Sequence, residues 1–390
     1  MILNGFDSDT NTFIYNLEEI LNKFDKKESL DIASIKSNFD TIQNCLNKKN
    51  NADIDKCLEQ HWSNIIAILR LIDCFHIGNS SKLLFNSAKL SVFDKKFPKG
   101  KPGGIMIHCP AGQRAPALIS RFKKEGTSVH FIIDRAEIKY KIKDEKTNEE
   151  KENTEIKTCV YLTAPLCYQA GHCGIKNKDT FNSSMIAIEN CDPPELDFRE
   201  VTLTQKEIDE INGDKKLKAK KVKKKAQELE GNSSKYIIIN DKIHKIKNDD
   251  EVLKAAYEYY QDIRNTSVDL CAMLCCLYGF EIDKTSKTEK GEDYPITVIS
   301  HREGNKRYKL ASTHSDPDEL WALYEKLCDN SFSGFMDKKT DQGYTDEIMN
   351  PFRMEISERI THYKQHPEKI HPLLKIMYHY YTYKDNKTPP

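Results

Sequence analysis

The polar segment before Cys271 marks the strongest candidate for a catalytic nucleophile in this 390-residue chain. Ser267 and Asp269 have the short polar side chains that cap the first turn of a helix, and an apolar run follows them. Cys271 would then lie in the first turn, where the helix dipole and free N–H groups favour a nucleophilic thiolate. The alternative is that Cys271, Cys275 and Cys276 are small core residues of a buried helix.

A cysteine nucleophile needs a base, and His130 is the candidate for that role. It lies in the apolar segment 128–134, which the residue pattern predicts to be a strand. A histidine on a rigid strand can reach a thiol on a neighbouring helix, and a carboxylate behind it would fix its tautomer. The alternative is a strand histidine that is simply hydrogen-bonded.

Cys109 and Arg114 have the outline of a phosphatase loop, in which an arginine and backbone N–H groups surround a phosphate. The chain is one residue short of the spacing that lets the guanidinium fold back over such a loop. The sequence therefore disfavours a phosphatase. Arg114 and Arg121 remain candidates for binding an anion.

Potential metal ligands gather between residues 159 and 191. Zinc sites usually pair two ligands at a Cys-x-x-Cys or His-x-x-x-His spacing, and the spacings here do not. We therefore predict no metal site. The residues concerned are Cys159, Cys167, His172, Cys173 and Cys191.

A basic segment, 301–309, follows a predicted strand. Guanidinium and ammonium groups concentrated in this way suit a polyphosphate ligand. The alternative is a solvated hairpin turn. The residues that would bind the ligand are His301, Arg302, Lys306, Arg307 and Lys309.

Composition narrows the class of protein. Hydrophobic residues make up 38% and charged residues 31%, and the net charge is zero, which argues against a general nucleic-acid binder. No apolar stretch approaches the length of a transmembrane helix, and we expect no secretory signal peptide. The 12 cysteines are irregularly spaced, which favours a reducing compartment over a disulfide framework.

The pattern of apolar residues divides the chain into three regions. Residues 1–97 and 331–390 are predicted to be helical. Residues 98–330 mix short strands with helices and predict an α+β domain, with charged insertions at 143–156 and 205–235. Helices are expected at 249–263, 316–327 and 347–382, and strands at 105–109, 128–134, 158–163, 185–188, 236–239 and 295–300.

Eight of the eleven residues from Lys215 to Lys225 are lysine. A solvated helix or insertion accounts for such a run. The functional alternatives are a nuclear-localisation signal or a patch that binds an anionic membrane or a phosphate.

Three segments, in order, resemble the YopJ family of bacterial effector acyltransferases. The first, 121–134, looks like the family's strand with its catalytic histidine followed by Phe. The second, 262–271, is similar to the acidic, Ser-rich approach to the nucleophile. The third, 294–307, resembles the family's Leu-Pro-x-x-Phe-Tyr-Lys-His-Thr-Gln segment without a gap.

The resemblance covers residues 105–325. It implies the ubiquitin-like-protease fold, a central mixed sheet with flanking helices. It also implies an effector that moves acetyl from acetyl-CoA to host Ser, Thr or Lys side chains, through a thioester on Cys271 with His130 as base. Inositol hexakisphosphate would activate it at 301–309, beside the coenzyme A site. A bacterial secretion system would deliver the chain to the host cytosol, and the lysine run could direct it to the nucleus.

Two departures from the family's pattern affect the expected site. Leu270 separates Cys271 from the acidic residue, and one extra residue on a helix turns a side chain by about 100°. The place of the family's Glu, at 162–165, has no carboxylate, which leaves Asp179 and Glu189 as candidates for the catalytic acid. The departures favour an inactive relative that binds a host protein, a partner effector or inositol phosphate. A cysteine protease or deubiquitinase of the same fold is the third interpretation.

Overall fold

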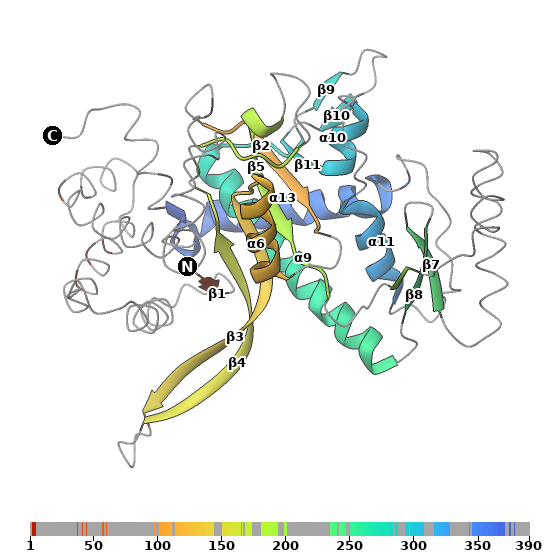
Figure 1. Ribbon diagram of the computed structural model, residues 1–390. Helices are drawn as coiled ribbons and strands as arrows, with labels where there is room; N and C mark the ends of the chain where they lie inside the picture. The colour runs from red at the N-terminus through yellow and green to blue at the C-terminus, as the bar shows by residue number, and fades with distance from the viewer. Residues whose placement is uncertain are drawn as a thin grey trace, which may run out of the picture.

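A computed structural model describes the part of the chain that carries the central sheet and the helices around it (Figure 1). The described residues are 2–4, 37, 41, 44, 57, 60, 97, 101–110, 114–143, 150–164, 166, 168–173, 181–193, 199–200, 235–239, 242–246, 250–283, 285–287, 293–295, 297–307, 316–327, 343, 345–370, 374–375 and 378.

A mixed six-stranded sheet, in the order β1-β4-β3-β5-β2-β11, forms the centre of the molecule (Figure 1). Its neighbouring strands β3, β5, β2 and β11 are parallel, and the pairs β3–β4 and β4–β1 are antiparallel. The carboxyl ends of β5, β2 and β11 therefore meet at one edge. The strands are β1 Ile2–Asn4, β2 Gly104–His108, β3 Phe131–Lys143, β4 Glu150–Leu162, β5 Met185–Asn190 and β11 Val298–Ser300.

Two small sheets and several helices complete the described structure. One sheet pairs β9 with β10, and the other has the order β6-β8-β7. Their strands are β6 Arg199–Glu200, β7 Lys235–Ile239, β8 Lys242–Ile246, β9 Thr285–Lys287 and β10 Asp293–Pro295. The helices are α6 Ala115–Glu125, η2 Phe181–Ser183, α9 Asp250–Tyr278, α10 His301–Arg307, α11 Asp318–Leu327, η3 Thr345–Met349, α13 Asn350–Gln365 and η4 Pro367–Lys369.

The core forms where helices cover both faces of the sheet. Every residue of β2 and β5 is buried, as expected for parallel strands that are covered on both faces. Figure 1 shows α6 in front of the sheet and α9 behind it. The long helix α9 contacts β3, β4 and β5, and α11 and α13 pack against it.

Most of the predicted strands are confirmed. Strands 105–109, 158–163, 185–188 and 236–239 coincide with β2, the end of β4, β5 and β7. β3 begins three residues later than predicted and runs on to Lys143, because it pairs with β4 along its whole length. The described part of the predicted charged insertion 143–156 belongs to this long hairpin, in which it pairs with β3. The predicted strand 295–300 is shorter, Val298–Ser300.

The predicted helices are confirmed with changed bounds. The helix expected at 249–263 continues without a break to Tyr278 as α9. The predicted helical region 1–97 lies almost wholly outside the described residues, but Ile2–Asn4 is a strand that pairs with β4. The boundaries at 97 and 330 stay predictions. The 205–235 insertion and the Lys215–Lys225 run also lie outside the described residues, apart from Lys235.

Among the described helices, none combines the length and apolar character needed to cross a membrane. This agrees with the expectation from sequence.

Candidate metal centre

Cys271 lies deep inside α9 rather than at a helix start. The predicted N-cap at Ser267 or Asp269 is wrong, because the helix begins at Asp250 and both residues lie within it. The Cys271 side chain is fully buried, and that burial raises its pKa, although a hydrogen bond with Ser267 opposes the shift. Cys271 therefore lacks the free N–H groups and the helix dipole of a first turn, which would have favoured a thiolate. The catalytic role of Cys271 stays a prediction that this burial does not favour.

His130 is hydrogen-bonded through both ring nitrogens. Its Nδ1 accepts the backbone N–H of Ala187 at 3.0 Å, and its Nε2–H donates to the carbonyl of Tyr168 at 2.8 Å. The ring also stacks on Phe97. Burial lowers the pKa of His130 to about 4, so the ring is neutral. Because both ring nitrogens are hydrogen-bonded, His130 joins β5 to the connection after β4. No hydrogen bond joins His130 to Cys271.

The arginines proposed to bind polyphosphate are paired with carboxylates. Arg114 Nε donates to Asp134 at 2.7 Å, and Arg121 lies 3.5 Å from Glu125. Arg302 is buried and hydrogen-bonded to Glu319. Each of these arginines thus has a carboxylate partner within the chain, and the Arg302–Glu319 pair is internal.

The basic segment begins a short helix, α10, rather than a hairpin turn. Lys306 and Arg307 lie in this helix, but their side chains are outside the described structure, as are Lys309 and Asp179. Among the predicted site residues that the structure describes, His301 and Glu189 lie at the same edge of the central sheet, where β11 and β5 end.

Polar residues follow three strands at the sheet edge where the parallel carboxyl ends meet. His108 ends β2, Glu189 and Asn190 end β5, and His301 directly follows β11. Glu189 and His108 are register partners on the parallel strands β5 and β2. Ligand sites in α/β sheets form at the carboxyl ends of parallel strands, so this edge is where we look for a site.

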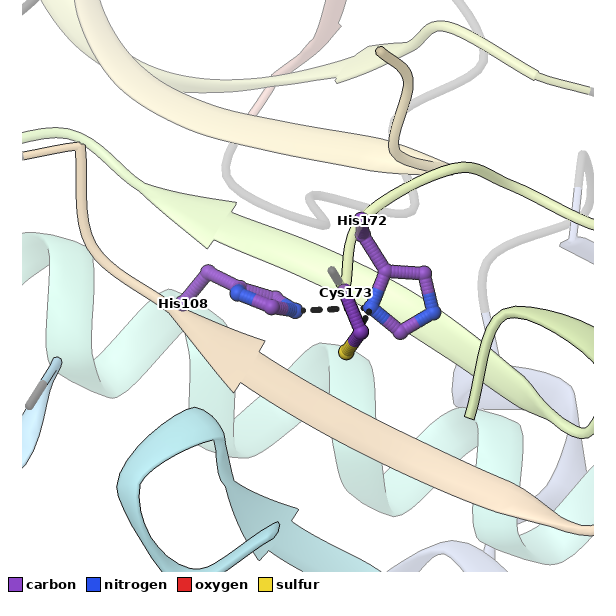
Figure 2. Close-up of side chains that lie close together, drawn as sticks. All are labelled: His108, His172 and Cys173. Carbon is purple, nitrogen blue, oxygen red and sulfur yellow. Dashed lines mark hydrogen bonds between the residues drawn. The ribbon is translucent and has the colours of Figure 1, made fainter. Parts of the chain in front are cut away.

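His108 is the centre of a group that we call the histidine cluster: His108, His172, Cys173, His301 and Asp316. His108 Nε2 lies 2.9 Å from His172 Nδ1, and His108 Nδ1 lies 3.1 Å from His301 Nδ1. Cys173 Sγ lies 3.3 Å from His172 Nδ1, as Figure 2 shows. Asp316 Oδ1 lies 3.3 Å from His301 Nδ1, and its Oδ2 lies 3.6 Å from His108 Nδ1.

Backbone hydrogen bonds hold the segments that carry the cluster. The N–H groups of His172 and Cys173 donate to Asn182 Oδ1 at 2.9 and 2.7 Å, and Asn182 Nδ2 donates back to the Cys173 carbonyl. The N–H of Cys109 donates to Asp316 Oδ2 at 3.1 Å. Asn182 therefore joins two parts of the connection between β4 and β5 and holds the backbone of His172 and Cys173 in place.

The surroundings of the cluster are buried and rich in carboxyl groups. Burial, followed by the charge of Asp316, raises the pKa of Glu189 well above its usual value. The Cys109 thiol donates to Asp192 Oδ1 at 2.7 Å, and burial with Asp192 raises the pKa of Cys109. Burial and the nearby His108 lower the pKa of His172. A neutral imidazole has a lone pair to offer, and it is the form that binds metal ions.

Two groups of donors in the cluster have the spacing of a metal site. We call His108 Nδ1, His301 Nδ1 and Asp316 the carboxylate side, and His108 Nε2, His172 Nδ1 and Cys173 Sγ the thiol side. Zinc–nitrogen bonds of about 2.0–2.1 Å in a tetrahedron put neighbouring ligand atoms about 3.3 Å apart. On the carboxylate side the two histidine nitrogens lie 3.1 Å apart, and each lies 3.3 or 3.6 Å from a different oxygen of Asp316, which is close to this value.

The sequence contained no motif for this site, because its donors come from four separate segments. The only signal was that His108 and His301 each lie at the end of a short apolar strand. Of the five residues considered earlier as metal ligands, His172 and Cys173 belong to the cluster. Cys159 and Cys191 do not, and Cys167 lies outside the described residues.

Comparison with known proteins does not supply a function for this chain. No protein-family model matches it, and neither a curated protein nor a solved structure matches it.

Proposed function

We propose that this chain is a metal-dependent hydrolase, with a zinc ion held by His108, His301 and Asp316. The observation that carries the proposal is the carboxylate side of the cluster. There the two histidine nitrogens lie 3.1 Å apart, and the Asp316 carboxylate faces both of them, with Oδ1 3.3 Å from His301 and Oδ2 3.6 Å from His108. Two histidines and a carboxylate are a donor set of catalytic zinc sites, in which the fourth position is open to water or substrate. The cluster lies at the carboxyl ends of parallel strands, and ligands of α/β sheets bind at such ends.

A zinc ion in such a site lowers the pKa of a water molecule and polarises a substrate carbonyl or phosphoryl oxygen. The residues of the chain would position the ligands. If Nδ1 held the ion, His108 would carry its proton on Nε2, and this N–H would donate a hydrogen bond to His172 Nδ1, 2.9 Å away. The Cys109 N–H orients the carboxylate of Asp316. Glu189, the register partner of His108, is the carboxyl group placed to carry a proton at this edge.

Metal content provides the first test. The purified chain should contain about one equivalent of zinc, and the variants His301→Ala and Asp316→Asn should lose it. His362→Ala is the matched control, because His362 lies on α13 and faces His366 rather than the cluster. Zinc retained by both cluster variants, with their circular dichroism unchanged, would rule out this site.

Activity provides the second test. The zinc-loaded chain should hydrolyse at least one of a panel of activated carboxylic esters, phosphoesters and peptides. His301→Ala should reduce the rate to background, and Glu189→Gln should lower the rate while zinc stays bound. A rate that is unaffected by removal of zinc would contradict the hydrolase.

A second candidate is the cysteine-dependent acyl transfer that the resemblance implies. One contact favours it: Cys173 Sγ lies 3.3 Å from His172 Nδ1, and His108 and His301 continue from that ring to Asp316. A thiol beside an imidazole, with a carboxylate behind, is the arrangement of a cysteine nucleophile. A mixed sheet crossed by a long helix also suits the ubiquitin-like-protease fold. The proposed reaction would pass acetyl from acetyl-CoA to Cys173 or Cys271, and then to a host protein.

Labelled acetyl-CoA with inositol hexakisphosphate tests this candidate. Label that is lost in Cys173→Ala but kept in Cys271→Ala would support the cluster as the acyl site, and the reverse would restore the nucleophile expected from sequence. Inositol phosphate binding without any label would favour the inactive relative. Reaction with a ubiquitin-family probe would favour the protease.

A further inference from the structure

His108 presents a different nitrogen to each side of the cluster. Its Nδ1 belongs to the carboxylate side and its Nε2 to the thiol side, so the two sides lie on opposite edges of one imidazole ring. A neutral imidazole has one nitrogen with a free lone pair, and the other nitrogen carries the proton. His108 can therefore serve as a ligand on one side at a time while it stays neutral.

We infer that the two sides are alternative positions for a single ion, and that the donor types decide which ion takes which side. This inference rests on the proposed function, because the carboxylate side is the proposed catalytic position. Carboxylate ligands suit hard ions such as Mn²⁺, and thiolate ligands suit soft ions. Zinc is intermediate, and catalytic sites also hold it with two imidazoles and a carboxylate. The thiol side, with two imidazoles and Cys173, is thus a second position where a soft ion, such as Cd²⁺, would displace the catalytic ion.

Whichever side the ion occupies, the other ring nitrogen of His108 keeps a hydrogen bond. With an ion on the carboxylate side, the His108 Nε2–H donates to His172 Nδ1 at 2.9 Å, which occupies the lone pair that the thiol side needs. With an ion on the thiol side, the His108 Nδ1–H faces His301 Nδ1 at 3.1 Å and Asp316 Oδ2 at 3.6 Å. The first state removes a ligand from the thiol side, and the second removes one from the carboxylate side.

Binding on the thiol side also requires a proton to leave Cys173. The thiol is buried and donates to the Met106 sulfur at 3.2 Å. When Cys173 Sγ bonds to the ion, the S–H bond breaks and its proton passes to the buffer, with no change of oxidation state. The backbone hydrogen bonds from His172 and Cys173 to Asn182 do not involve either donor atom, so the loop keeps its anchor.

The test is a competition between Mn²⁺ and Cd²⁺ on the full chain. Bound Mn²⁺ is followed by electron paramagnetic resonance, and thiolate-bound Cd²⁺ by its ultraviolet charge-transfer band. We expect Cd²⁺ to release Mn²⁺ one for one as the band grows. Cys173→Ser should abolish the band and leave Mn²⁺ affinity unchanged. Asp316→Asn should weaken Mn²⁺ by more than the about 10–100-fold typical of losing an outer-shell partner, and keep the band.

The outcomes separate this inference from the proposed function. If Mn²⁺ stays bound while the Cd²⁺ band saturates, the chain holds two ions at once. That result would overturn the inference that one ion excludes the other, and it would leave the catalytic position intact. A band that survives Cys173→Ser would also overturn the inference, because the cadmium thiolate would then lie elsewhere. Mn²⁺ binding that is insensitive to Asp316→Asn would instead remove the proposed function. The control His362→Ala should match the wild type in both signals.

Discussion

The ion pair between Glu303 and Arg353 offers the sharpest test of how the site is supported. Arg353 Nη1 and Nη2 donate to the two oxygens of Glu303 at 3.0 and 3.2 Å, and Nη1 also donates to the carbonyl of Val298 at 3.2 Å. Glu303 is 4% exposed and Arg353 is 6% exposed. The pair thus joins α13 to α10 and to β11, two residues from His301.

Replacing Arg353 with Met should cost about 3–5 kcal/mol of unfolding free energy, because it leaves the Glu303 carboxylate buried without its partner. The double variant Glu303→Gln/Arg353→Met should cost clearly less, since neither remaining group is charged. Urea denaturation followed by circular dichroism measures both. Zinc affinity should fall in the single variant, because α10 begins at His301.

Arg359→Met is the control on the same helix. Arg359 lies 3.5 Å from Asp269 and is 53% exposed, so its loss should cost no more than about 1 kcal/mol. If Arg353→Met costs as little as Arg359→Met, or if the double variant is as unstable as the single one, the reasoning from a buried charge fails.

Three further predictions concern buried groups outside the cluster. The pKa of His130 is lowered from 6.5 to about 4, so its contribution to stability is complete above pH 6.5 and is lost as the pH falls towards 4; the loss amounts to about 3 kcal/mol. His130→Asn should flatten that part of a pH series of urea denaturation curves. Because burial raises the pKa of Cys271, iodoacetamide should label it at neutral pH only after unfolding, and rapid native labelling in a mass spectrum would contradict this. Asp134 accepts hydrogen bonds from Arg114 Nε at 2.7 Å, from the Ala115 N–H that starts α6 at 2.8 Å, and from the Tyr259 hydroxyl at 2.5 Å. Asp134→Asn should therefore lower the unfolding free energy by about 1–3 kcal/mol, and an unchanged urea midpoint would refute this.

The apolar strands could be predicted because their burial is visible in the residues themselves. A run such as 105–107 has no polar face, so it can only be a fully buried strand or part of a buried helix. The length of β3 was not predictable in the same way. Its charged second half, which ends at Lys143, is a strand because it pairs with β4 residue by residue.

The predicted start of the helix that carries Cys271 was wrong because short polar side chains also form tertiary hydrogen bonds. In α9 the polar residues before Cys271 point to neighbouring helices. Arg264 makes two hydrogen bonds to Glu355, and Asp269 accepts the hydroxyl of Tyr363 at 3.0 Å. Of the two residues predicted to cap the helix, Asp269 thus has a tertiary partner instead, and the helix continues through it.

The sequence by itself determined which segments are buried strands and that His108 and His301 stand at the ends of two of them. Only the tertiary structure decided that these histidines meet, because β11 and β2 are parallel neighbours whose carboxyl ends lie at one edge. The same holds for His172, Cys173 and Asp316, which reach that edge from loops. Residue spacing reports local geometry, whereas a site built across strands depends on their order in the sheet.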